Sequence, residues 1–137
     1  MILIIDDDIA VTTSLSLLLK SEGFESMTAA SGYAAMALLN KNTFDLVILD
    51  MNFSIDTTGK DGLLLLEKIK TQYPALPVIL ITGWATIELA VQGMKLGAND
   101  FINNTLLQIQ CLQILGDFGM AEVKLNKVFP IIKDRYK

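Results

Sequence analysis

The sequence predicts an α/β fold in which a parallel five-stranded sheet is covered by helices on both faces. Two observations favour this fold. Short apolar runs recur along the chain, and amphipathic helical patterns separate them. Apolar runs that do not alternate with polar residues are typical of strands buried on both faces. Strands that alternate with helices imply parallel pairing and right-handed crossovers.

The strands are predicted from these runs. Three runs are continuous, namely Ile2–Ile5, Leu46–Leu49 and Val78–Ile81, whereas Phe24–Thr28 and Asn99–Ile102 carry a weaker form of the pattern. Five alternating strand–helix units are expected to give the strand order 2-1-3-4-5, which is the flavodoxin-like, doubly wound arrangement.

The helices are predicted from apolar residues at helical spacing. Ser31 is a candidate N-cap for the second helix, while Gly23, Pro74 and Gly97 are placed to end the first, third and fourth. The five apolar stripes begin at Val11, Ala34, Leu63, Ile87 and Leu107. Residues 1–116 are thus predicted to form one domain, and residues 117–137 a C-terminal tail that is either an extra helix or the start of a linker.

The amino-acid composition excludes several classes of catalytic and binding site. The chain has 137 residues, 52% of them hydrophobic, a formal charge of −4, no histidine and one cysteine, Cys111. An internal disulfide, Ser-His or Cys-His catalysis and most zinc sites are therefore excluded. Without a Lys/Arg run, no nucleic-acid surface is expected. No apolar run is long enough to span a bilayer and no signal peptide is seen, so we expect a cytoplasmic location.

Acidic residues follow two of the predicted strands. Asp6, Asp7 and Asp8 come directly after the first strand, Asp50 ends the third, and Thr82 ends the fourth. Parallel strands bring their carboxyl ends to one edge of the sheet, where ligands bind. Crowded carboxylates call for a cation, and with only oxygen ligands at hand Mg²⁺ is favoured. Magnesium beside an aspartate nucleophile suggests phosphoryl transfer.

A purely structural explanation of the aspartate triplet stays open. Carboxylates at a helix N-terminus accept hydrogen bonds from free backbone N–H groups and interact favourably with the helix dipole. We expect Asp8 to have this role. Asp50 could likewise be an ordinary strand-end residue, so the prediction of a site depends on the joint occurrence of these residues.

Residues 1–115 resemble the receiver domains of two-component response regulators. The resemblance is carried by "IIDDD", "VILDMN", the Asp61-Gly62 pair, "ILITGWA" and "KLGANDFI". It implies a domain that accepts a phosphoryl group from a sensor histidine kinase, with Mg²⁺ as cofactor, and then switches a partner-binding surface. It implies autocatalysed acceptance rather than metabolic turnover, so we do not expect an enzyme in the ordinary sense.

The resemblance also implies roles for individual residues. Asp50 is the phosphoacceptor, Thr82 the switch hydroxyl and Phe101 the switch aromatic. The implied magnesium ligands are Asp7 directly, Asp6 largely through water, Asp50, and the backbone carbonyl of Asn52. An ordinary structural role also remains possible for both residues, with Thr82 as a strand-end residue and Phe101 as a core residue.

The sequence departs from the family pattern in two places. The polar loop Phe53–Lys60 is longer than usual and resembles, more weakly, receivers attached to sigma-factor-activating ATPases of the nitrogen-regulation type. Asn104 and Thr105 stand where the family has lysine and proline. Either a substitution or a small deletion explains this, and Lys60 is the one lysine we can suggest as a replacement.

Three functions therefore remain open. The leading one is the phosphoacceptor domain, with a homodimer formed through the fourth helix, fifth strand and fifth helix as a further expectation. The second is a pseudo-receiver, a binding module without phosphate control, for which the missing lysine is the only support. The third is a haloacid-dehalogenase-like phosphatase, but such enzymes carry a second aspartate where this chain has Asn52. A dinucleotide-binding fold is excluded because no G-x-G-x-x-G motif follows the first predicted strand.

Overall fold

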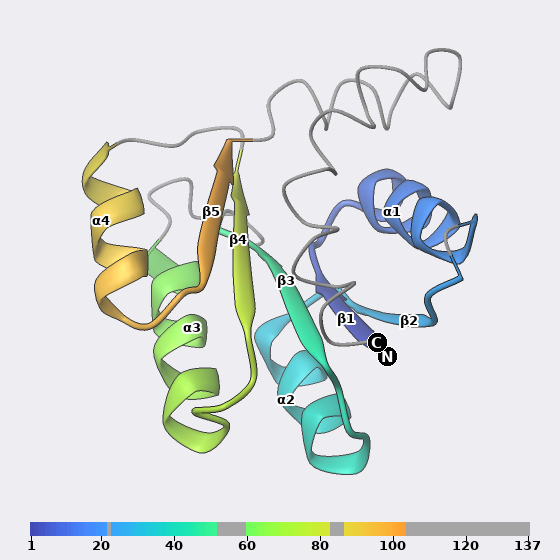
Figure 1. Ribbon diagram of the computed structural model, residues 1–137, viewed down its shortest axis with the longest axis horizontal. Helices are drawn as coiled ribbons and strands as arrows, with labels where there is room; N and C mark the ends of the chain where they lie inside the picture. Colours follow the sequence, from blue (N-terminus) through green and yellow to red (C-terminus); the bar gives the residue numbers. More distant parts are fainter. Residues whose placement is uncertain (22, 52–59, 83–86, 104–137) are drawn as a thin grey trace.

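The computed structural model describes residues 1–21, 23–51, 60–82 and 87–103. It confirms the predicted parallel sheet, with five strands in the order β2-β1-β3-β4-β5 (Figure 1). The strands are β1 (Ile2–Ile5), β2 (Ser26–Ala29), β3 (Leu46–Asp50), β4 (Val78–Thr82) and β5 (Asp100–Asn103). The described helices are α1 (Ile9–Ser21), α2 (Gly32–Lys41), α3 (Lys60–Gln72) and α4 (Ile87–Lys95).

The strand β1 shows why its apolar run does not alternate. Ile2 and Ile4 pack into one core cluster together with residues of α1, whereas Leu3 and Ile5 pack into another with residues of α2 and α3. All four side chains are at most 1% exposed. The helix α1 lies on one side of the sheet, and α2, α3 and α4 lie on the other (Figure 1). Each residue of β1 therefore faces a hydrophobic layer, whichever way it points.

The predicted helix ends are confirmed by their backbone geometry. Ser31 precedes α2, and its hydroxyl oxygen accepts a hydrogen bond from the Ala34 N–H at 3.1 Å. Gly23 and Gly97 follow α1 and α4 with φ of +88° and +103°, a left-handed conformation that glycine adopts without steric cost. The helix α3 ends at Gln72, shortly before Pro74.

Two strands begin later than the sequence predicted. Ile2 is paired with Ser26, so β2 starts at the level where β1 starts. Phe24, predicted as strand, instead packs in the core cluster beneath α1, and its N–H donates to the Leu19 carbonyl at 2.9 Å. The strand β5 begins one residue after Asn99.

The C-terminal predictions lie outside the described residues. These are the fifth helix, which begins near Leu107, and the tail 117–137. Within the part of the chain that the structure describes, no helix is both long and apolar enough to cross a membrane.

Candidate functional site

The structure brings together three of the predicted acidic residues. Carboxylate oxygens of Asp6, Asp7 and Asp50 all lie within 4.8 Å of one another. The cause is the register of the sheet, since Ile5 at the end of β1 lies opposite Leu49 near the end of β3. Asp6 and Asp50 are buried, at 4% and 5% exposure, while Asp7 is exposed. The cluster therefore has two buried carboxyl groups and a third that faces solvent.

The three consecutive aspartates have different roles in the local structure. The Asp8 carboxylate accepts a hydrogen bond from the Ala10 N–H at 2.9 Å, and the Asp8 carbonyl accepts one from the Thr12 N–H at 3.1 Å. Asp8 is thus the N-cap of α1, as predicted. Asp6 accepts the Asp8 N–H at 3.0 Å through its carboxylate, which holds the start of the helix against the acidic cluster.

Burial controls the protonation of Asp6. The pKa of Asp6 is raised to about 8. The main cause is burial, which removes the carboxyl group from water, and the second is the neighbouring charge of Asp50. A side-chain hydrogen bond to Asp50 acts in the same direction, whereas the bond from the Asp8 N–H opposes it. In the absence of a cation, Asp6 therefore holds a proton at neutral pH, beside the side chain of Asp50 to which it is hydrogen-bonded.

The donor set fits a hard divalent cation. Three carboxyl groups offer oxygen atoms to one point, and the exposed side of Asp7 leaves room for bound water. Mg²⁺ binds in this way, through few carboxylates and several waters. A bound Mg²⁺ would take the place of the proton on Asp6, since a cation relieves the same repulsion.

The remaining predicted residues are placed by the backbone alone or lie outside the described part. Thr82 is the last residue of β4 and is paired with Asn103, while Phe101 is paired with Leu80. Asp50 is paired with Ile81, so Thr82 is one residue beyond the level of the acidic cluster in the neighbouring strand. The other predicted positions, Asn52, Phe53 to Gly59, Asn104 and Thr105, lie outside the described residues, and Lys60 is the first residue of α3.

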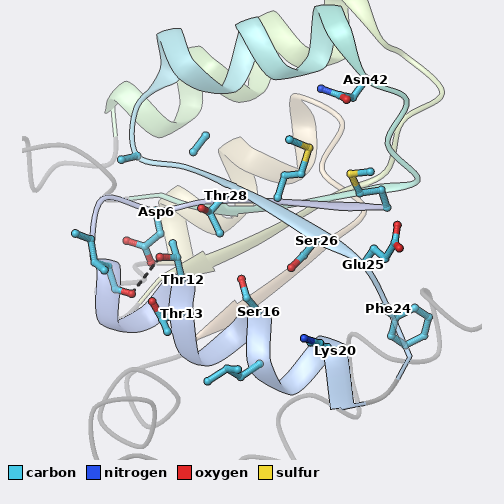
Figure 2. Close-up of a pocket in the computed structure, with 16 residues that line it drawn as sticks. Asp6, Thr12, Thr13, Ser16, Lys20, Phe24, Glu25, Ser26, Thr28 and Asn42 are labelled. Atoms are coloured by element: carbon cyan, nitrogen blue, oxygen red, sulfur yellow. Dashed lines mark hydrogen bonds between the residues drawn. The ribbon is translucent and has the colours of Figure 1, made fainter.

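A hollow of about 850 Å³ lies beside the acidic cluster, between α1 and β2. Figure 2 shows Asp6 at one end of this groove and the side chains of Thr12, Thr13, Ser16 and Lys20 along α1. The Thr12 hydroxyl donates to the Ile9 carbonyl at 3.1 Å, and so serves the helix itself. Asp7 and Asp50 do not line the groove, which is therefore distinct from the three-carboxylate cluster.

Sequence reasoning named Gly62 only as part of a motif, without a role. In the structure Gly62 lies in α3 directly against the backbone of Met51, the residue that follows Asp50. A buried glycine in a helix is an indirect signal of such a close approach, but the sequence does not show which segment approaches.

Comparison with known proteins gives consistent results. The family model of the response regulator receiver domain matches residues 2–115. A putative NtrX-like response regulator of Rickettsia bellii is 41% identical over 101 residues, which are 74% of this chain and 21% of the relative. The receiver domain of NtrX from Brucella abortus has a TM-score of 0.68 and 35% identity, over 83% of this chain and 99% of that one. The N-terminal receiver domain of a Bacteroides fragilis response regulator has a TM-score of 0.64 and 41% identity, over 78% and 89%. The chain spans about a fifth of the length of the curated relatives it matches.

Proposed function

This chain belongs to the response regulator receiver domain family, and on that basis we propose that Asp50 accepts a phosphoryl group from a sensor histidine kinase. Receiver domains are phosphorylated by histidine kinases and generally bind Mg²⁺ at an acidic pocket. The observation that carries the proposal is the convergence of Asp6, Asp7 and Asp50 at the carboxyl edge of the sheet. It supplies both a nucleophile and the oxygen ligands for a cation.

In the proposed reaction, one carboxylate oxygen of Asp50 attacks the phosphorus atom of a phosphohistidine. The new O–P bond forms as the P–N bond breaks, and the histidine ring nitrogen leaves with the electron pair. A bound Mg²⁺ would reduce the electrostatic repulsion between the anionic carboxylate and the anionic phosphoryl group. Asp6 and Asp7 would hold the cation, and β3 holds Asp50 at the edge of the sheet.

The acceptor needs an ionised Asp50. In the metal-free protein the raised pKa keeps the proton on Asp6, and Asp6 is hydrogen-bonded to the Asp50 side chain. Asp6 and Asp7 would hold a cation in place of this proton, and the Asp50 oxygen would then no longer accept the hydrogen bond from Asp6. We therefore propose that the cation prepares the nucleophile as well as shielding the phosphoryl group.

The proposed output is a change in a binding surface. Thr82 is proposed as the hydroxyl that moves toward the phosphoryl group and Phe101 as the aromatic that follows it. The surface next to them includes α4, on which the apolar side chains of Val91 and Met94 are 45% and 47% exposed. Exposed apolar residues of this kind suit a protein partner or a second copy of the chain, and we propose weak self-association through α4, β5 and the predicted fifth helix.

The pseudo-receiver remains the second candidate function. It is favoured by Asn104, a neutral residue where the family has a lysine that contacts the phosphoryl group. Against it stands the complete acidic cluster. A module released from phosphate control has no need to keep two buried carboxyl groups, whose burial destabilises the fold at neutral pH unless a cation or proton is present.

The two candidates differ in a simple experiment. The wild-type protein and Asp50→Asn are incubated with acetyl phosphate and Mg²⁺, and the intact masses are measured. The proposal predicts one labile phosphoryl adduct on the wild type and none on Asp50→Asn. A wild-type protein that binds Mg²⁺ but never acquires the adduct would favour the pseudo-receiver. Steady release of phosphate from unrelated monoesters would favour the phosphatase.

A further inference from the structure

The peptide that follows Asp50 is held between two elements. Met51 is 1% exposed, and its N–H donates to the Ile81 carbonyl of β4 at 2.9 Å. On its other side lies Gly62 of α3. A Cβ atom built on Gly62 would lie 2.4 Å from the Met51 carbonyl oxygen and 2.8 Å from the Met51 Cα. Both distances are under 3.0 Å, a separation that real Cβ atoms essentially never show.

We propose that Gly62 is a positioning residue for the phosphoacceptor. Because it has no side chain, α3 can lie directly on the backbone of Met51 and fix the carboxyl end of β3. The consequence for metal and phosphoryl binding rests on the function proposed above, but the contact itself does not. No side chain other than hydrogen fits at position 62 without moving the backbone next to Asp50.

The need for glycine here is steric and not conformational. Among the described glycines, only Gly23 and Gly97 have a positive φ, so Gly62 has a backbone that any residue can adopt. Glycine is a poor helix former, and Gly62 is the third residue of α3. Its presence in α3 is explained by the close approach to Met51.

Gly93 of α4 provides a contrast. A Cβ on Gly93 would lie 2.4 Å from the Leu80 Cδ1 atom, which is the free end of a flexible side chain. A methyl group at position 93 would meet the end of the Leu80 side chain, whereas one at position 62 would meet the Met51 backbone, which can give way only by moving β3 or α3. Gly62 and Gly93 are both glycines within helices, and they differ in what an added methyl group would meet.

The contact also bears on the long loop. Met51 is the last described residue before residues 52–59, and Lys60, the first residue of α3, follows them. The contact between Met51 and Gly62 thus connects the described residues on the two sides of this segment. Functional groups must be held to within about 0.5 Å for a site to work, and this contact lies one residue from Asp50.

The experiment compares Gly62→Ala with Gly93→Ala in the full chain. In metal-free protein, hydrogen exchange measures the protection of the Met51 amide, and calorimetry then measures the Kd for Mg²⁺. We expect Gly62→Ala to expose the Met51 amide while the amides of β1 and β2 stay protected. We expect its Kd to rise about ten-fold, the scale on which residues that orient metal ligands act. Gly93→Ala should match the wild type in both measurements.

A folded Gly62→Ala protein with a protected Met51 amide and an unchanged Kd would overturn the proposal. If that variant does not fold, the wild type decides the matter, since the contact requires a nuclear Overhauser effect between the Hα protons of Gly62 and Met51. Its absence would overturn the proposal and its presence would support it. A wild type that binds no Mg²⁺ would count against the proposed function, whereas the exchange of the Met51 amide tests Gly62 in either case.

Discussion

The carboxyl groups of Asp6 and Asp50 are hydrogen-bonded to each other at the adjacent ends of β1 and β3, although they are far apart in the sequence. Both are buried, and such a pair cannot carry two negative charges without a cation. A proton on Asp6 relieves the repulsion in the metal-free protein, and a cation in its place would form the centre of the proposed acceptor site. This relationship connects the fold to its proposed chemistry.

The stability of the metal-free protein should fall as the pH rises. The pKa of Asp6 is raised from 3.8 to about 8, so between these values the folded state binds more protons than the unfolded state. The contribution of Asp6 to stability is complete below about pH 4 and is lost as the pH rises through about 8. We expect the free energy of unfolding to fall by on the order of a few kcal/mol, as measured by urea unfolding in the presence of a chelator. Asp6→Asn should flatten this dependence, and an equally steep dependence in that variant would contradict the assignment.

Magnesium binding should release a proton. Because the cation replaces the proton on Asp6, the affinity is expected to rise with pH by up to about ten-fold per unit below pH 8. Calorimetry in buffers of different ionisation enthalpy measures the number of protons released. Asp7→Ala should remove the magnesium heat, and a wild type without such heat would show that the metal site is wrongly assigned.

Asp8 should be dispensable for the metal and needed for the helix. Its carboxylate caps α1 through the Ala10 N–H, so Asp8→Ala should cost about 1 kcal/mol of stability. Its magnesium affinity should remain that of the wild type. Asp7→Ala is the matched control with the opposite expectation, lost magnesium binding without a lost cap. A large loss of magnesium affinity in Asp8→Ala would mean that the two roles are not separate.

Asn104 should limit the switch more than the acceptance of a phosphoryl group. A neutral side chain attracts a phosphorylated Asp50 less than lysine would, and the end of β5 should therefore move less. Sedimentation with and without beryllofluoride, a phosphoryl mimic, compares the wild type with Asn104→Lys. We expect the mimic to increase self-association more in Asn104→Lys. A wild type that dimerises as fully as this variant would show that the missing lysine does not matter.

The sequence predicts the sheet well because a strand covered on both faces leaves a continuous apolar run, as Ile2–Ile5 shows. The sequence also predicts that Asp8, unlike Asp6 and Asp7, caps a helix, because capping depends only on residues nearby in the sequence. The start of β2 was missed, since pairing with Ile2 and not apolar character sets it. The protonation of Asp6 and the contact of Gly62 with Met51 could not be predicted, because each depends on which distant segment lies nearby.

If Asp50 accepts the phosphoryl group, chemical trapping should locate that group at position 50. After incubation with acetyl phosphate and Mg²⁺, borohydride reduces an aspartyl phosphate to homoserine, which tandem mass spectrometry assigns to one position. We expect homoserine at position 50, dependent on Mg²⁺ and absent in Asp7→Ala. Homoserine at any other aspartate, or at none in a protein that binds Mg²⁺, would contradict it.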